Sequence, residues 1–409
     1  LEEPTQPNIC VMEDVHFSAD EIKAYMDQSA LDMNTPAVTQ TSIALEDAEN
    51  LGSLIQPIIK NPGLIRERME QSGIFEHLLL SGTHRKLRKV LEMCEYLQQR
   101  YQVVVANPPY MGSRNMNTDL KQFSNDQYKD YKRDLFAMFI KRNTELALPG
   151  GELGFMSPFV WMFITSYESL RRFLINKKTI SSLIQLEYGG FSGAVVPICT
   201  FTVVNTHFPN YEGAYIRLSD FKGPKNQAPK TLEAIENPDC RWFYRTSAAD
   251  FKKIPGAPIA YWVSEKIINV FAKGEILDKY ADAKQGLATA DNSRFLRLWH
   301  EVSLNQCGFG YSSREKADVS DKRWFPYNKG GAFRRWYGNH EYVINWENDG
   351  KELRGFSRAV LRNQNYYFKE SGSWSKITSG DFCLRYFPPG FLFDVAGCSI
   401  FGYKRNLIH

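Results

Sequence analysis

The stretch Tyr101-Gln-Val-Val-Val-Ala-Asn-Pro-Pro-Tyr110 decides the fold class of this chain. Its first six residues form a short, hydrophobic and β-branched run, which predicts a strand over 101–106. The strand must end at Asn107, because Pro108 and Pro109 have no backbone N–H to continue a ladder of hydrogen bonds. In open α/β sheets, ligands gather outside the carboxyl ends of the strands. The tetrapeptide Asn107–Tyr110 is therefore the first candidate for a functional site.

The residues that follow predict helices alternating with strands. We expect helices over 132–148 and 167–176, with Pro149-Gly-Gly151 stopping the first, and strands over 152–157, 180–186 and 198–205. The last two strands are joined only by the Gly-rich stretch 189–193, so they should form a hairpin. This order is typical of the second half of a doubly wound α/β sheet.

The rest of the chain suggests three flanking segments. Residues 1–97 are expected to be helical and irregular, 98–206 to form the half-domain with the sheet, and 207–280 to be a connector with an exposed Pro- and Lys-rich loop over 222–230. Residues 281–409, with short aromatic strands between Gly, Asn and Asp, predict a second, mixed or mostly β domain, which we expect to be incomplete. Because the chain opens with Leu-Glu-Glu-Pro, we interpret it as a piece of a longer protein.

Composition excludes several classes. The 409 residues are 43% hydrophobic and 23% charged, which fits two or three globular domains. No apolar run approaches the roughly 18–20 residues that span a bilayer, so no membrane association is expected. Seven scattered cysteines without a CxxC pair argue against disulfides and a zinc site, and predict a cytoplasmic protein without metal. A net charge of +4 does not by itself identify a nucleic-acid binder.

The tetrapeptide can perform a specific kind of chemistry. Two prolines make its backbone rigid, so the side-chain oxygen of Asn107 and the carbonyl of Pro108 can converge as two acceptors. Two acceptors suit an exocyclic aromatic amine, whose lone pair becomes available when both of its hydrogens are bound. Tyr110 would offer a flat face to the base that carries this amine. The alternative is a proline-rich turn in which Tyr110 only packs.

A second candidate site lies in the segment 321–337, where basic residues alternate with six aromatic ones. Basic side chains suit phosphates, and arginine can also bind guanine edges. The alternative is a solvated basic face over an aromatic core. The candidate DNA-binding residues are Lys322, Arg323, Lys329, Arg334 and Arg335.

Three segments carry a family resemblance. Val103–Ser113, Asp134–Ile140 and Gly151–Pro158 resemble N6-adenine DNA methyltransferases, in particular the PglX family of BREX phage-defence systems. The resemblance resumes at Gly286–Asn292, Arg323–Gly330 and Trp374–Ser379, which places the segment after 281 in a target-recognition domain. It implies S-adenosylmethionine as cofactor, double-stranded DNA as partner, and further phage-defence proteins as possible partners.

The resemblance also assigns roles to single residues. It implies that Asn107, Pro108 and Tyr110 hold an adenine extruded from the duplex, and that Phe191 covers the other face of that base. Asp134 and Phe136 would lie near the cofactor. The alternatives are an N-terminal helix charge for Asp134 and core packing for Phe191.

One expected element is missing from the sequence. A Gly-rich cofactor loop should precede the tetrapeptide, but Gly52, Gly63, Gly73 and Gly82 are isolated. We therefore expect the first half of the sheet to be absent and the chain alone to bind cofactor poorly. Two other functions stay open: methylation of a protein glutamine or an rRNA guanine N2, which uses the same tetrapeptide, and a non-catalytic DNA-recognition module.

Overall fold

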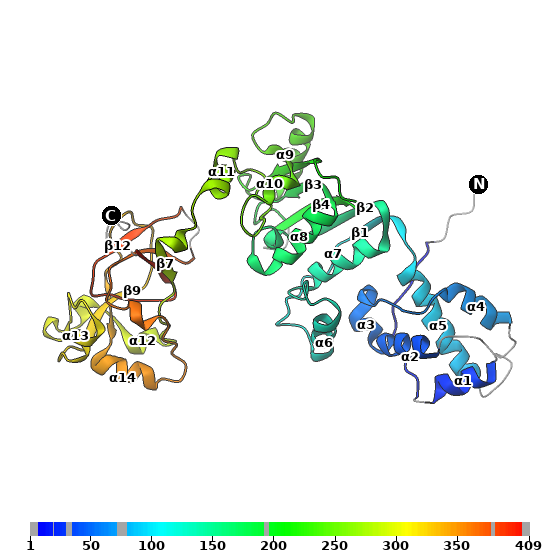
Figure 1. Cartoon of the computed structure of the whole chain (residues 1–409), viewed down its shortest axis with the longest axis horizontal. Coiled ribbons are helices and arrows are strands. Elements are labelled where there is room, and N and C mark those ends of the chain that lie inside the picture. The colour runs from blue at the N-terminus through cyan, green and yellow to red at the C-terminus, as the bar shows by residue number, and fades with distance from the viewer. Residues whose placement is uncertain are drawn as a thin grey trace. The chain divides into compact units, whose positions relative to one another are not determined.

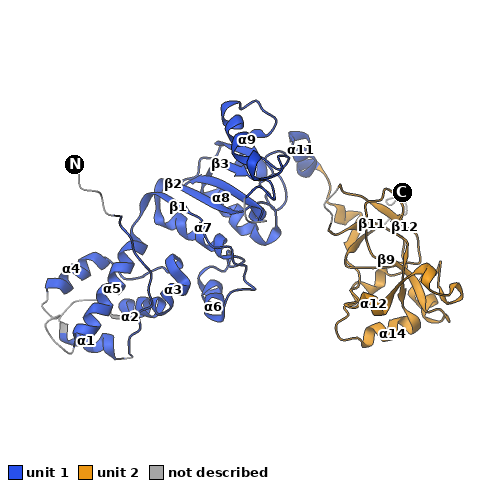
Figure 2. Ribbon diagram, turned by 180° about the vertical axis from the view of Figure 1, so that it is seen from behind, with its two compact units in different colours: residues 1–273 blue, residues 274–409 orange. Residues whose placement is uncertain are grey.

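The computed structural model of the chain describes residues 7–18, 20–29, 35–71, 80–191, 196–377 and 381–402. These residues form two units, 1–273 and 274–409, which Figures 1 and 2 show. Each unit has its own hydrophobic core and is described by itself.

Helices make up the first part of unit 1, as the sequence predicts. Their bounds are α1 (Glu21–Ser29), α2 (Thr35–Ala44), α3 (Ala48–Leu51), α4 (Pro62–Gln71) and α5 (Ser81–Gln98), with the 3₁₀ turn η2 (Gly52–Leu54) between α3 and α4. The longest, α5, buries Leu87, Leu91 and Cys94 on one face. Apolar residues at this spacing lie on one side of a helix, so burying them holds α5 against its neighbours.

A six-stranded mixed sheet follows, in the order β1-β2-β4-β3-β5-β6. β1 is parallel to β2 and β3 to β5, whereas β4 is antiparallel to both β2 and β3. The expected α/β class and the expected antiparallel pair are thereby confirmed. The strands are β1 (Tyr101–Ala106), β2 (Ala147–Pro158), β3 (Thr179–Gln185), β4 (Ile198–Val204), β5 (Glu212–Arg217) and β6 (Phe243–Ser247).

Helices α7 and α8 cover one face of this sheet. Phe136 and Ile140 of α7 and Leu174 of α8 share a core with Phe155 of β2 and Phe201 of β4. On β1, the alternate residues Val103 and Val105 are 61% and 78% exposed. The helices of unit 1 after β1 are α6 (Thr118–Gln127), α7 (Leu135–Leu146), α8 (Glu168–Lys177), α9 (Pro224–Glu236), α10 (Ala248–Phe251) and α11 (Glu265–Lys273).

Two local expectations were wrong. Helix α7 ends at Leu146, and Pro149-Gly-Gly151 lies inside β2 because pairing with β1 resumes after a register shift between Tyr101 and Val103. The stretch 222–230 is not a loop, because α9 starts at Pro224. Proline is tolerated there because the first N–H groups of a helix have no hydrogen-bond partner within the helix. The segment 207–280 also supplies β5 and β6, so it extends the sheet.

Unit 2 is mostly β, as expected. Its two four-stranded sheets have the orders β13-β9-β10-β8 and β12-β11-β14-β7. The strands are β7 (Ala281–Lys284), β8 (Leu296–Leu298), β9 (Trp324–Asn328), β10 (Tyr342–Asn345), β11 (Ser371–Ser375), β12 (Arg385–Phe387), β13 (Leu392–Phe393) and β14 (Gly397–Gly402), and the helices are α12 (Asn292–Phe295), α13 (Arg314–Asp318) and α14 (Glu347–Gly355).

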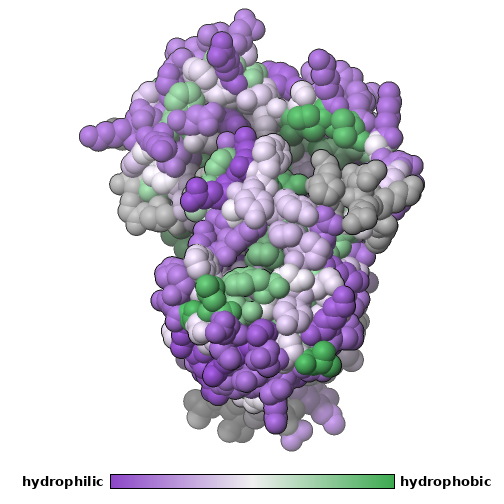
Figure 3. Space-filling model, turned by 90° about the vertical axis from the view of Figure 1, so that its left-hand side faces the viewer, coloured by the Kyte–Doolittle hydropathy of each residue, from purple (hydrophilic) through white to green (hydrophobic). Residues whose placement is uncertain are grey.

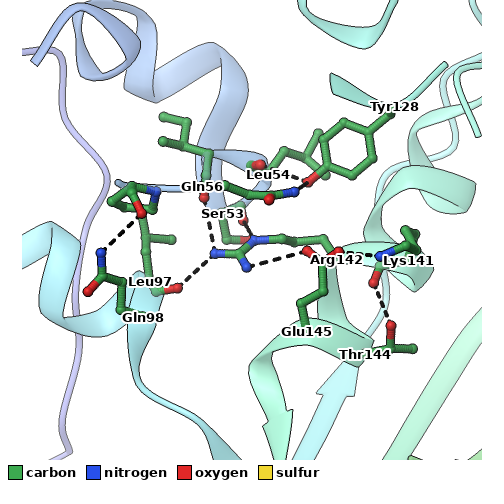
Figure 4. A network of polar contacts seen from close by, with 12 residues as sticks. Ser53, Leu54, Gln56, Leu97, Gln98, Tyr128, Lys141, Arg142, Thr144 and Glu145 are labelled. Carbon is green, nitrogen blue, oxygen red and sulfur yellow. Dashed lines mark hydrogen bonds and ion pairs between the residues drawn. The ribbon is translucent and has the colours of Figure 1, made fainter. Parts of the chain in front are cut away.

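A buried arginine joins the first helices to the sheet. Arg142 of α7 donates to the carbonyl oxygens of Ser53 (2.9 Å), Ile55 (3.1 Å) and Leu97 (2.7 Å), as Figure 4 shows. Its guanidinium also lies 3.7 Å from the Glu145 carboxylate. Burial lowers the pKa of Arg142, and the neighbouring Tyr128 and Glu145 oppose that shift. The helical segment and the sheet are therefore parts of one unit.

Figure 3 shows one face on which hydrophilic residues predominate and hydrophobic residues form small, separate patches. Across the described ranges, no helix combines the length and the apolar character that crossing a bilayer would require.

Candidate active site

The tetrapeptide lies where the sequence places it, directly after β1. Asn107 is exposed and Pro108 is buried, while Tyr110 is 39% exposed. The Tyr110 hydroxyl donates to Asn107 Oδ1 at 2.9 Å and lies 3.4 Å from the carbonyl oxygen of Met156 in β2. Burial raises the pKa of Tyr110, so the hydroxyl keeps its proton at neutral pH. This bond fixes the Asn107 side chain at the carboxyl end of β1.

Asp134 ties the end of the tetrapeptide to the start of α7. Its carboxylate oxygen Oδ1 accepts from the backbone N–H of Met111 (3.0 Å) and of Phe136 (3.3 Å). The backbone N–H of Leu135 donates to the Met111 carbonyl, and that of Ser113 donates to the Arg133 carbonyl, both at 3.0 Å. Asp134 thus has the contacts of a residue at a helix N-terminus, while its role near a cofactor stays a prediction.

Replacing Asp134 tests this cap. Burial raises the pKa of Asp134 more than its hydrogen bonds to backbone N–H groups lower it. Asp134→Asn keeps an acceptor and should preserve stability, whereas Asp134→Ala should cost about 1 kcal/mol. Because the pKa of Asp134 is higher in the folded state, the folded protein binds more protons than the unfolded one between the two pKa values. The stability of the wild type should therefore fall, relative to Asp134→Asn, as the pH rises from the unfolded pKa to the folded one. Urea unfolding at several pH values between about 4 and 7 measures both effects; parallel pH profiles would contradict the second.

Phe136 and Tyr167 support Tyr110 from the core. Phe136 is only 1% exposed and meets the Tyr110 ring edge-on at 6.4 Å. The Tyr167 ring lies 5.4 Å from Phe136, and burial raises the pKa of Tyr167 to about 12. Sequence reasoning missed Tyr167, because it belongs to no local motif and is brought in by the short turn η5 (Thr165–Tyr167) after β2.

Phe191 is 45% exposed and lies within the Gly-rich stretch 189–193, of which residues 192 and 193 lie outside the described residues. In the part of the chain that is described, Tyr110 has a ring contact with Phe136 and none with Phe191. The sandwich of Tyr110 and Phe191 around a base stays a prediction.

The described residues do not form a complete site for S-adenosylmethionine. Asp134 already accepts two backbone N–H groups with one oxygen, and Phe136 has almost no exposed face. The sequence of residues 1–106 contains no Gly-rich run of the kind that cradles a cofactor. The described residues therefore hold the tetrapeptide and the start of α7 in a fixed geometry, and binding of a base or a cofactor here stays a prediction.

In unit 2, the basic and aromatic segment splits into two parts. Trp324, Phe325 and Tyr327 belong to β9 and are buried, whereas Phe333, Trp336 and Tyr337 are 50%, 70% and 62% exposed. The core interpretation thus fits 324–328, and 333–337 presents an exposed aromatic surface.

The five candidate basic residues differ in their contacts. Lys329 forms a 2.7 Å ion pair with the buried Asp394, and Lys322 donates to the Asn305 carbonyl. Arg323 lies 4.0 Å from Glu347. Arg334 is exposed, and exposed Arg335 lies over the Phe333 ring at 5.0 Å. Their roles in DNA binding stay predictions.

Comparisons with known proteins show what this chain is similar to. Residues 34–191 match the family model of the Eco57I restriction-modification methylase. The chain is 38% identical over 372 residues to the adenine-specific methyltransferase BrxX of Escherichia coli O9:H4 (strain HS), a match covering 88% of this chain and 29% of that protein. It is also 38% identical over 336 residues to the adenine-specific methyltransferase PglX of Lacticaseibacillus casei (strain Zhang), covering 79% of this chain and 28% of that protein.

The chain is a relative of adenine-specific methyltransferases. The resemblance based on the tetrapeptide and its neighbours is thereby confirmed. The chain spans less than a third of either relative's length. A solved structure of the Type ISP restriction-modification enzyme LlaGI with a DNA substrate mimic matches 89% of this chain and 35% of that one, with 15% identity and a TM-score of 0.46.

Proposed function

We propose that this chain is part of an S-adenosylmethionine-dependent methyltransferase that modifies the N6 amine of adenine in double-stranded DNA, in phage defence or restriction-modification. The observation that carries the proposal is the hydrogen bond from Tyr110 to Asn107 Oδ1 at the open end of β1. It holds an exposed acceptor beside an exposed aromatic ring, which suits a planar base with an exocyclic amine.

The residues would act by alignment and hydrogen bonding. The N6 amine of adenine is a poor nucleophile, because its lone pair is delocalised into the ring. The Asn107 side-chain oxygen and the Pro108 carbonyl would accept its two hydrogens, which favours a tetrahedral nitrogen with an available lone pair. S-adenosylmethionine would supply the methyl group. Neither carbonyl is basic enough to remove a proton, so the proton that the methylated nitrogen loses would pass to water, and the contribution of this chain is preorganised electrostatics.

The adenine must leave the duplex to reach this position. Its amine is engaged in base pairing inside the stack, so extrusion costs a few kcal/mol. Stacking on an aromatic side chain contributes roughly 1–3 kcal/mol and offsets part of that cost. Tyr110 has the exposure to stack, and the buried Phe136 holds the ring from behind.

Unit 2 favours DNA over the other acceptors with a planar nitrogen. Its exposed run Phe333–Tyr337 combines two arginines with three aromatic rings. Arginine can contact phosphates or guanine edges, and aromatic rings can stack on unpaired bases. A methyltransferase acting on a protein glutamine has no need of such a surface.

Transfer of a tritiated methyl group from S-adenosylmethionine tests the acceptor. Unmethylated plasmid DNA, ribosomes and total protein would be offered in parallel to this chain and to a version extended to the length of its relatives. Label in adenine of the plasmid supports the proposal. Label in rRNA or protein would show that the acceptor is not DNA. DNA binding without any methyl transfer would favour the non-catalytic recognition module.

Two substitutions at Tyr110 separate stacking from hydrogen bonding. Tyr110→Ala removes both and should lower kcat/KM for DNA by a factor equivalent to roughly 1–3 kcal/mol. Tyr110→Phe keeps the ring and loses the bond to Asn107, so it should cost only about 0.5–1.5 kcal/mol. Steady-state methylation rates measure the difference. Equal losses in both variants would show that the ring does not stack on the base.

A further inference from the structure

A basic cavity lies in the segment between the tetrapeptide and α7. It has a volume of about 310 Å³ and is lined by Ser113, Lys121, Lys129, Lys132, Arg133 and Ser166 among others. Five of these six come from the stretch 113–133, which includes α6, and Ser166 comes from η5. Residues of α6, of the chain on either side of it and of η5 thus line one cavity.

The cations of this cavity are unneutralised. Lys121, Lys129, Lys132 and Arg133 are all exposed, and across the described ranges none of the four forms a salt bridge. Lys132 donates to Asn125 Oδ1 at 2.8 Å, which leaves its charge uncompensated. One carboxylate, Asp130, shares the lining. Like charges repel, so a cluster of this kind is best stabilised by an anion between its members.

We propose that this cavity binds a backbone phosphate of the DNA strand that carries the target adenine. The proposal rests on the proposed function and deepens it. Lysine and arginine side chains with neighbouring serine hydroxyls are the donors that commonly contact DNA phosphates. Phosphate contacts fix the position of the duplex without reading its sequence.

The chain connection brings the cavity to the right distance. Ser113 follows Tyr110 by three residues, so their Cα atoms are at most about 11 Å apart. A DNA strand carries one charge per about 3.4 Å of helix axis, so a phosphate within a few nucleotides of an extruded base reaches this hollow. Ser166 also directly precedes Tyr167, which packs on Phe136 beneath the Tyr110 ring. A phosphate bound here would therefore hold the strand close to the Tyr110 ring that is proposed to stack on the base.

The salt dependence of DNA binding tests the proposal without cofactor. The double variant Lys121→Ala/Lys129→Ala removes two exposed cations of the cavity. The matched control Lys222→Ala/Lys225→Ala removes two exposed lysines at the start of α9 and changes the net charge equally. Fluorescence anisotropy with a labelled duplex at several salt concentrations gives the slope of log K against log [salt] for each protein.

The cavity variant should reduce the magnitude of this slope by about 1 and weaken binding equally for unrelated duplex sequences, because each phosphate contact contributes about 0.9. The control should keep the wild-type slope. Circular dichroism and thermal unfolding confirm that both variants fold. A wild-type slope in the cavity variant, or the same reduction in the control, would overturn the proposal.

The readout also keeps the two proposals apart. If the salt dependence of DNA binding is reduced in the cavity variant, while the chain and its extended version methylate nothing, the phosphate site stands and the methyltransferase proposal fails. If the cavity variant keeps both its slope and DNA methylation by the extended version, the phosphate site fails and the methyltransferase proposal stands.

Discussion

Replacing Asn107 by alanine should lower the rate of methyl transfer to DNA by about 10²–10³-fold, the largest catalytic effect we expect. The substitution removes the side-chain acceptor at the end of β1 and leaves the Tyr110 hydroxyl only the more distant Met156 carbonyl as a partner. The Pro108 carbonyl alone would bind only one hydrogen of the amine, so the nitrogen lone pair would stay delocalised. Tritium transfer by a version extended to the length of the relatives measures the rate.

Two further variants make the Asn107 result specific. Asn107→Asp keeps a side-chain oxygen acceptor and should retain more activity than Asn107→Ala. Asn115→Ala removes another exposed asparagine a few residues downstream and should leave the rate unchanged. DNA binding should be similar in all three, because base stacking and phosphate contacts remain. A rate in Asn107→Ala within a few-fold of wild type would rule out the amine-binding role.

The largest effect on stability is expected at Arg142. Arg142→Met keeps much of the side chain's length but removes the donors for the carbonyls of Ser53, Ile55 and Leu97. The carbonyls of Ile55 and Leu97 would then be buried without this partner, at about 1–3 kcal/mol for each group, and the half-buried Ser53 would lose its bond as well. We expect the free energy of unfolding to fall by about 3–5 kcal/mol. Urea unfolding followed by circular dichroism measures it.

Arg172→Met is the matched control for Arg142. Arg172 lies on α8 with its side chain 53% exposed and forms a 2.7 Å ion pair with Glu168 one turn earlier. Such surface pairs contribute little, so the control should cost less than about 0.5 kcal/mol. Similar losses in the two variants would mean that the buried network does not hold the helical segment to α7.

Local sequence signals predicted the elements whose causes are local. The strand 101–106 has its predicted bounds, because a β-branched run meets two prolines that cannot continue it. The antiparallel pairing of β3 and β4 followed from the lack of a helix between them. Asp134 has the contacts of a helix cap, which the order Asp134-Leu135-Phe136 suggested as one of two interpretations.

Features that depend on distant partners could not be predicted. Pro149-Gly-Gly151 has the composition of a helix stop, yet pairing with β1 draws it into a strand. Lys329 is one of several basic residues in its segment, and its ion pair is with Asp394, far along the chain. Arg142 shows the same limit, because its carbonyl partners lie between 45 and 89 residues away in sequence. No local pattern distinguishes such a residue from a surface arginine.

The backbone hydrogen bonds between Met111–Ser113 and Arg133–Leu135 have a consequence for how the segment between them can vary. These backbone hydrogen bonds bring the two ends of the intervening segment together, so the positions of both ends are fixed. The exposed residues of 114–132 could therefore be exchanged while Asn107 and Asp134 keep their mutual positions, whereas Leu120 and Tyr128 are fixed by their burial against the helical segment. Among related proteins, we expect these exposed residues to vary more than the tetrapeptide and Asp134.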